Sequence, residues 1–144
     1  MKYVTREHIH VDRIATAWAI RRFVDPDASF SFVPRSADVA GIDGITFDVR
    51  GAELGHRRGR CTFDALIEKH ELADEGLRRM AVIIRGADLP QDVLAPPESP
   101  GVLAVFTGIR DSCDTDEDRL TRGSVVCDAL YAYCVQTEQA GRSL

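Results

Sequence analysis

Residues 6–23 read REHIHVDRIATAWAIRRF, and they form the most informative stretch of the chain. Two histidines and an aspartate open the stretch, and an apolar segment with helical periodicity follows. Asp12 is a favourable N-cap, because its carboxylate can accept a hydrogen bond from a free amide of the first helical turn. We expect a helix that begins there and runs to about Val24, since the dipeptide Asp25-Pro26 discourages its continuation.

Two arginines share the apolar face of this helix. At about 100° per residue, one broad arc contains Ile14, Ala17, Trp18, Ile20 and Val24. Arg13 and Arg21 fall inside the same arc, although a buried guanidinium is costly unless it is paired. Arg13 also lies in the first turn, where the helix dipole disfavours a cation. The pattern predicts an anionic partner, which is either a carboxylate of the chain in a structural salt bridge or a bound oxyanion.

The remaining patterns predict an α+β fold that is mostly helical, with a small β-sheet from the N-terminal half. A length of 144 residues suits one core, so we expect residues 1–144 to form a single domain. Strands are predicted at residues 2–5, 29–33 and 45–49, and further helices at 62–70, 74–86, 102–109 and 115–138. Thr62 and Asp74 are the expected caps of two of these helices, and Gly86 is the expected stop of one.

Composition and charge restrict the function. The net charge of −5 argues against general nucleic-acid binding, which depends on positive charge. No apolar run approaches the roughly 18–20 residues that cross a bilayer, and the N-terminus lacks a secretory apolar region. We therefore expect a cytoplasmic protein without a membrane span, and reduced cysteines. No dinucleotide or P-loop fingerprint occurs, so no nucleotide cofactor is expected.

Five residues are candidate metal ligands: His10, Asp12, Glu53, His56 and Asp88. The first pair is two residues apart, which lets both side chains point the same way in an extended segment. Glu53 and His56 lie in a glycine-rich loop, and Asp88 follows a predicted helix. Imidazole and carboxylate ligands suit a divalent ion such as Zn, Mn, Fe or Ni. The alternative is that these histidines are ordinary hydrogen-bonded residues.

The glycine-rich loop also suggests an anion pocket. Arg57, Arg58 and Arg60 crowd it beside His56, and Arg13 and Arg21 are candidates to face it. Guanidinium groups bind tetrahedral dianions such as chromate and sulfate well. The alternative is a solvated basic loop.

Cys61 is a candidate redox thiol. It follows the loop arginines and precedes a helix start, and both features lower the pKa of a thiol. It could then be a redox sensor, a metal ligand or a reductant of chromate. The alternative is a small buried residue.

Three blocks of sequence resemble one known family. They are HVDRIATAWAIRRFVDPDASFSFV (10–33), GAELGHRRGRCTFDALIEKHEL (51–72) and IIRGADL (83–89), and CDALYAY (127–133) echoes the tail of the family pattern. The chain resembles the chromate-resistance family, namely the C-terminal domain of ChrB-type proteins. All five candidate metal ligands fall within these blocks.

The resemblance implies a part in chromate resistance and in the response to chromate stress. We expect a domain that binds a metal or a small oxyanion and acts as a sensor or accessory protein. The alternative is a metal- or thiol-dependent enzyme, with redox chemistry on chromate or a small anionic substrate. Longer ChrB-type members carry an extra N-terminal region linked to regulation, whereas this chain starts at the family-like block. Direct DNA binding by this chain alone is therefore not expected, and the oligomeric state stays open.

Overall fold

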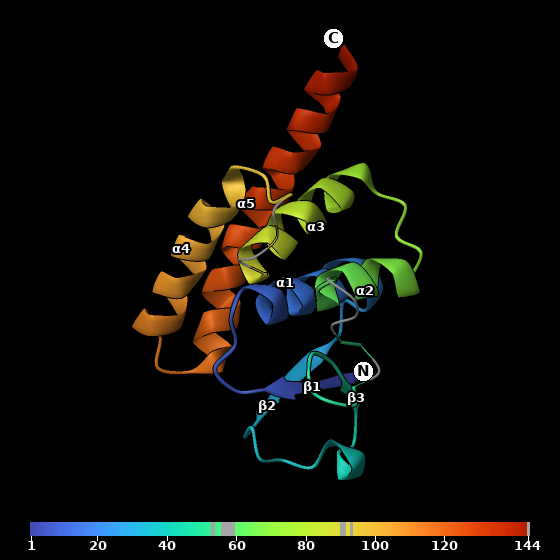
Figure 1. The fold of residues 1–144 in the computed structure, drawn as a ribbon. Helices are drawn as coiled ribbons and strands as arrows, with labels where there is room; N and C mark the ends of the chain where they lie inside the picture. The colour runs from blue at the N-terminus through green and yellow to red at the C-terminus, as the bar shows by residue number, and fades with distance from the viewer. Residues whose placement is uncertain (53, 56–59, 90–91, 93, 144) are drawn as a thin grey trace.

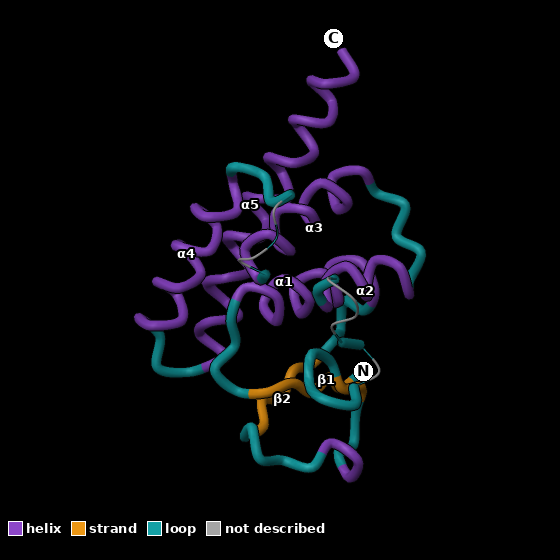
Figure 2. Tube along the Cα trace, in the orientation of Figure 1, coloured by secondary structure: helices purple, strands orange, loops and turns teal. Residues whose placement is uncertain are grey.

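Helices dominate the structure, which is a computed structural model of the chain. It describes residues 1–52, 54–55, 60–89, 92 and 94–143 (Figure 1). Figure 2 shows the strands gathered at one end and the helices packed beside them. The predicted α+β class, mostly helical with a small sheet from the N-terminal half, is confirmed.

Three short strands form a parallel sheet with the order β2-β1-β3, so that β1 lies in the middle. The strands are β1 (Lys2–Arg6), β2 (Ser29–Val33) and β3 (Ile45–Thr46). All three strands were expected, the second and third from alternating sequence patterns, but β3 is shorter than predicted. Its pairing ends because Asp48 adopts a φ of 49°, outside the extended region that a strand requires.

The first helix starts two residues earlier than predicted, with its N-cap at His10 instead of Asp12. Helix α1 (Val11–Ala19) has His10 at its N-cap and continues as a π-helical segment, η1 (Ile20–Val24). The predicted end at Val24 is therefore confirmed. Asp12 as the N-cap is wrong, because it is already the second residue of the helix and its carboxylate caps a different helix.

The later helices are α2 (Thr62–Lys69), α3 (Glu75–Asp88), α4 (Glu98–Ser112) and α5 (Asp116–Ser143). Asp74 caps α3 as predicted, by accepting a hydrogen bond from the amide of Leu77. The N-cap of α2 is Cys61 rather than Thr62.

Two predicted boundaries of the later helices are wrong. Helix α3 continues past Gly86, which has no side chain because the Ser99 hydroxyl and Ala95 lie against its backbone. Helix α4 begins at Glu98 and not at residue 102 as predicted, since a proline in the first turn, here Pro100, costs no intrahelical hydrogen bond.

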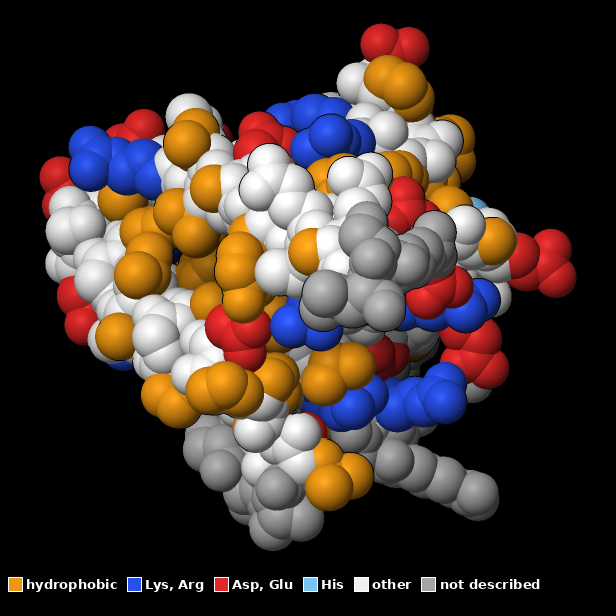
Figure 3. Space-filling model, turned by 90° about the horizontal axis from the view of Figure 1, so that it is seen from above, with side chains coloured by type: hydrophobic (Ala, Val, Ile, Leu, Met, Phe, Trp, Pro, Cys, Tyr) orange, Lys and Arg blue, Asp and Glu red, His pale blue; other side chains and the backbone are white. Residues whose placement is uncertain are grey.

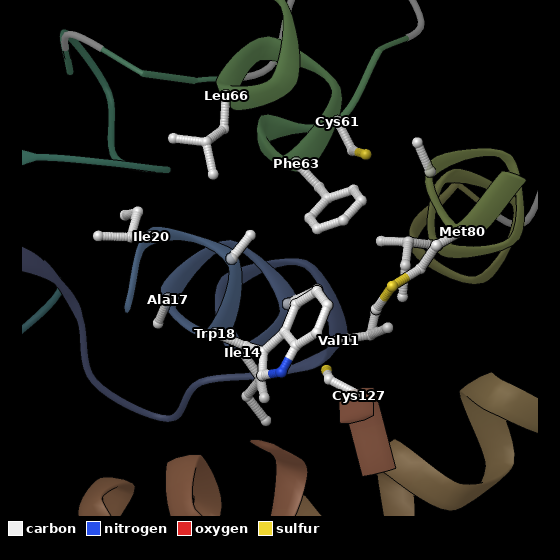
Figure 4. Close-up of a cluster of buried hydrophobic side chains, with 14 of the residues drawn as sticks. Val11, Ile14, Ala17, Trp18, Ile20, Cys61, Phe63, Leu66, Met80 and Cys127 are labelled. Carbon is white, nitrogen blue, oxygen red and sulfur yellow. The ribbon is translucent and has the colours of Figure 1, made fainter. Parts of the chain in front are cut away.

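The core is arranged around α1, which packs on α2, α3 and α5. Figure 4 shows Trp18 of α1, Phe63 of α2, Met80 of α3 and Cys127 of α5 directed into one apolar region. The Trp18 indole nitrogen also donates a hydrogen bond to Asp128 of α5 at 2.9 Å. In the described part of the chain, no helix combines the length and apolarity needed to cross a bilayer.

Candidate functional site

An arginine-lined cavity opens where the strands end. Arg6 is the last residue of β1, Arg35 follows β2 by two residues, and Asp48 and Arg50 follow β3. Parallel strands end at the same edge of a sheet, so these residues converge there. Arg13, in the first turn of α1, completes the wall. This cavity, the arginine hollow, has a volume of about 710 Å³.

Arg13 is anchored by Asp48. Its Nη2 and Nε atoms donate to the Asp48 carbonyl oxygen at 3.0 and 3.3 Å. The same Nε lies 3.4 Å from the carboxylate oxygen Oδ2 of Asp48, and the two side chains are only 22% and 12% exposed. The anionic partner expected for Arg13 is thus present in the chain as a carboxylate.

The other guanidinium groups of the hollow have no such partner in the part of the chain that the structure describes. Among the residues that the structure describes, Arg6, Arg35 and Arg50 make no ion pair. A smaller adjoining cavity shares Arg6, Arg13 and Arg35 and adds Glu7. On the helical face in Figure 3, by contrast, basic side chains lie next to acidic ones. The hollow therefore concentrates positive charge in a protein whose net charge is −5.

The turn between β1 and α1, which positions Arg6 and Arg13, is tied to α5. The backbone amides of His8 and Ile9 each donate to the carboxylate of Asp116 at 2.9 Å. Asp116 also pairs with Arg119 at 3.1 Å, and both residues are buried. A buried ion pair with satisfied hydrogen bonds holds one geometry, so this end of the hollow has a fixed frame.

The described members of the arginine set predicted for an anion pocket, which are Arg13, Arg21 and Arg60, lie apart from one another. Arg21 is exposed, donates to the Ala28 carbonyl at 3.2 Å and stacks on Phe30. Arg60 pairs with Glu68 at 2.7 Å and lines a separate cavity of about 520 Å³ between α2 and α3. Arg57 and Arg58 lie outside the described residues. Of the predicted set, Arg13 alone is described at the arginine hollow.

Sequence reasoning missed Arg6, Arg35 and Arg50. A usable signal was present, because each of them follows a predicted strand closely. Ligands of open α/β sheets bind outside the carboxyl ends of the strands. That rule would have selected these arginines if a parallel sheet had been assumed.

Asp12 is almost fully buried and caps α2 across the core. Its two carboxylate oxygens accept hydrogen bonds from the amides of Thr62 and Phe63, both at 2.9 Å. Burial, together with the negative charges of Asp48 and Asp88, raises its pKa to about 7. The two amide bonds oppose that rise, since they favour the ionised carboxylate.

Asp88 lies within electrostatic range of both this carboxylate and His10. Burial and the charge of Arg110 lower the pKa of His10, and the charge of Asp88 acts in the opposite direction. The Nδ1 atom of His10 is buried and has no hydrogen-bond partner among the described residues. The imidazole is therefore in its neutral form near pH 7, which is the form that binds metals.

The predicted metal site is described only in part. Glu53 and His56 lie outside the described residues, so their distance from His10 and Asp12 is not part of the structure. Within the described ranges, no group of three or more His, Cys, Asp or Glu side chains is arranged to hold a metal ion. The five-residue metal site stays a prediction.

Cys61 is fully buried, and its environment differs from the one that its sequence neighbours suggest. Its Sγ atom lies 3.3 Å from the Asp64 carboxylate, to which it donates. Burial raises the pKa of the thiol, and the charges of Asp12 and Asp64 add to the rise. The expected lowering of its pKa is wrong, because the thiol faces carboxylates and the core.

Comparison with known proteins agrees with the family-like blocks. The family model described as ChrB, C-terminal domain, matches residues 3–134, a range that contains the whole arginine hollow. Protein ChrB from Cupriavidus metallidurans is 35% identical over 133 residues, which are 92% of this chain and 40% of that relative. This chain thus spans about two fifths of the length of the relative. No solved structure matches this chain.

Proposed function

Since the chain belongs to the family of the ChrB C-terminal domain, we propose that it binds chromate or a similar small oxyanion and serves chromate resistance as a sensor or accessory domain. The arginine hollow is the observation that carries this proposal. Three of its guanidinium groups make no ion pair with a described carboxylate, and a fourth is held in place by Asp48. Guanidinium forks match tetrahedral oxyanions in charge and in hydrogen-bonding geometry.

The position of the hollow in the fold supports the same function. After β1 the chain forms β2 on one side of β1, and it later forms β3 on the other side of β1. Ligands of open α/β sheets bind at such a reversal, outside the carboxyl ends of the strands. The N-terminus of α1 also lies there, and its dipole and free amides favour a negative charge.

The size of the hollow indicates how an oxyanion would be held. A water molecule takes about 30 Å³ of liquid, so about 710 Å³ is far more than one tetrahedral ion requires. The ion would then occupy the part nearest the guanidinium groups and keep some of its water. Water-mediated contacts of this kind are nearly as favourable as direct ones.

Titration of the protein with chromate tests the proposal. We expect the double substitution Arg35→Gln and Arg50→Gln to weaken binding roughly tenfold or more, because charged hydrogen bonds are lost. Both side chains are exposed and lack ion pairs with described residues, so folding should be spared. Arg122→Gln, an exposed arginine on α5, is the matched control and should bind as the native protein does. If the double variant bound chromate as tightly as the native protein does, the arginine hollow would be excluded as the binding site.

A metal-dependent function is the second candidate. The observation that favours it is the buried Nδ1 of His10, which has no hydrogen-bond partner among the described residues. Asp12 follows two residues later, and burial together with the charges of Asp48 and Asp88 raises its pKa to about 7. Carboxylate and imidazole donors suit Zn, Mn, Fe or Ni, and an ion with open positions would supply Lewis-acid chemistry. A thiol-dependent enzyme gains no such support, because Cys61 is buried and its pKa is raised.

Elemental analysis of protein purified without a chelator tests the metal candidate. We expect about one equivalent of metal in the native protein and much less in the variants Asp88→Ala and His56→Ala. Metal content that does not change in either variant would remove this candidate and leave the oxyanion proposal standing.

A further inference from the structure

We propose that the arginine hollow holds a diphosphate group, with one phosphate at Arg6, Arg13 and Arg35 and the other at the turn that carries Arg50. The ligand is then inorganic pyrophosphate or a small molecule that ends in a diphosphate. This inference rests on the proposed oxyanion site and adds a second, linked anionic group to its ligand.

The hollow has room for more than a single tetrahedral ion. Its volume of about 710 Å³ lies within the range of about 300–1,000 Å³ that is typical of pockets for small-molecule ligands. Its described lining contains no aromatic side chain, and Val49 and Ala52 are the only apolar side chains of that lining. A ligand that fills more of this space must therefore be polar, and the arginines require it to be anionic.

The cationic side chains of the hollow divide between two parts of its wall. Arg6, Arg13 and Arg35 line both the hollow and the smaller adjoining cavity, so they lie together where the two cavities meet. Arg50 lines the hollow but does not line the smaller cavity, so it belongs to another part of the wall. Two linked phosphates can engage both parts at once, whereas one small ion engages only one of them.

The turn that carries Arg50 also offers backbone donors. The amide of Ala52 closes this turn by donating to the Val49 carbonyl oxygen at 3.0 Å. The amides of Arg50 and Gly51 donate to no described residue, and both residues line the hollow. Gly51 has a φ of 79°, which glycine adopts without strain. Successive amides in such a turn form a concavity that binds anions, so this part of the wall suits a phosphate group.

Linkage of the two phosphates provides the gain in affinity. Once the first phosphate is bound, the second meets its own donors within the same molecule, at a high effective concentration. Arg6, Arg35 and Arg50 make no ion pair with a described residue, so the ligand displaces water from them and no carboxylate of the described chain. Each contact is then a charge-assisted hydrogen bond, which is stronger than a neutral one.

Calorimetric titration of the native protein with phosphate and with pyrophosphate tests the inference. We expect pyrophosphate to bind more tightly by roughly tenfold or more, because it adds charge-assisted hydrogen bonds at the turn. Trimetaphosphate, a compact ring of similar charge, controls for charge alone and should bind more weakly than pyrophosphate. Titration with ADP distinguishes the sources of the group. Tighter binding of ADP than of pyrophosphate would identify a nucleotide as the ligand, and equal or weaker binding would identify the free ion.

The variant Arg50→Gln tests the two parts of the wall separately. It removes the cation at the turn and leaves the other three arginines, so it should weaken pyrophosphate binding more than phosphate binding. The ratio of the two affinities should therefore fall towards one. Arg50 is exposed and makes no ion pair with a described residue, so we expect the variant to fold. Arg122→Gln on α5 is the matched control and should keep the native ratio.

The outcomes separate this inference from the function on which it rests. If pyrophosphate binds no more tightly than phosphate or trimetaphosphate, the diphosphate site is wrong and oxyanion binding stands. An unchanged ratio in Arg50→Gln would likewise exclude the turn as the second phosphate site. If pyrophosphate binds as expected but chromate does not, the chromate function fails and the diphosphate site stands. If none of these anions binds, both fail.

Discussion

The carboxylate of Asp12 experiences two opposing influences in the core. The amides of Thr62 and Phe63 donate to it and favour its ionised form. Burial and the nearby charges of Asp48 and Asp88 favour its neutral form, and they prevail, since its pKa is raised to about 7. A group that keeps its proton in the folded state but releases it in the unfolded state links stability to pH.

The sign of this linkage gives a testable prediction. Between the unfolded pKa of 3.8 and the folded value of about 7, the folded protein binds the proton that the unfolded chain has lost. The contribution of Asp12 to stability is therefore full below pH 4 and is lost as the pH rises towards 7. We expect this group to lower the free energy of unfolding by up to roughly 1 kcal/mol per pH unit in that window.

Urea unfolding at several pH values between 4 and 7 measures this effect. Asp12→Asn cannot titrate, so its stability should depend less on pH than that of the native protein. The variant should also be less stable throughout, because an amide cannot accept both hydrogen bonds that cap α2. Parallel pH profiles in the two proteins would show that Asp12 titrates normally.

For single residues, a property can be predicted when it follows from the residue and its neighbours in the sequence. It cannot be predicted when it depends on residues that are distant in the sequence. The anionic partner of Arg13 was predictable, because a cation on an apolar face needs one wherever the partner comes from. The cap formed by Asp12 was not, since its partners lie about 50 residues away along the chain. The raised pKa of Cys61 was missed because tertiary burial outweighs the effect of neighbouring arginines.

Close contact between α1 and α5 depends on a glycine within a helix. A Cβ atom added at Gly123 would overlap the buried side chain of Ile14 and would crowd Phe106 at 3.3 Å. Glycine lowers helix stability by about 1 kcal/mol relative to alanine. The close packing of α1 on α5 therefore comes with a loss of helix propensity in α5. Gly108 in α4, by contrast, has no atom of a described residue within 4 Å of its Cβ position.

Alanine substitutions at these two glycines should act in opposite directions. We expect Gly123→Ala to destabilise the protein by about 1–3 kcal/mol, because overpacking in the core outweighs the gain in helix propensity. Gly108→Ala should instead stabilise it by about 0.5–1 kcal/mol, since only the propensity changes. Thermal or urea unfolding of the two variants measures both effects. An increase in stability for Gly123→Ala would show that the helices do not pack as closely as described.

The helices and strands themselves were largely predictable, because periodicity and capping are local signals. The exceptions were residues whose type is compatible with two different local structures. Gly86 can end a helix or admit a neighbour, and Pro100 can break a helix or begin one. Contacts with Ser99 and Ala95 decide the first case, and the position of Pro100 in the first turn of α4 decides the second.

Across the whole molecule, the order of the strands determines where the hollow forms. Residues 6, 13, 35, 48 and 50 meet because β1 lies between two parallel neighbours, with the ends of all three strands at one edge. Alternating patterns predict strands but carry no information on their order or direction. The sequence therefore predicted the type of site, in which arginines bind an oxyanion. Of the residues that the structure describes there, it identified only Arg13.

A ligand that binds only the folded chain must stabilise the whole molecule. At a concentration 100 times its dissociation constant, the gain is about 2.7 kcal/mol. For a chain of this length, that corresponds to a rise in the melting temperature of roughly 5–10 °C. We expect chromate to produce such a rise in the native protein, measured by calorimetric or fluorescence melting against sodium chloride at equal ionic strength.

The matched variants make that melting experiment specific. The double variant Arg35→Gln and Arg50→Gln should show little or no rise, while Arg122→Gln should respond as the native protein does. The chloride control removes general screening, which acts on all surface charges over about 8–10 Å at physiological salt. A chromate-induced rise of equal size in the double variant would locate binding elsewhere, because a hollow stripped of two guanidinium groups cannot supply the same free energy.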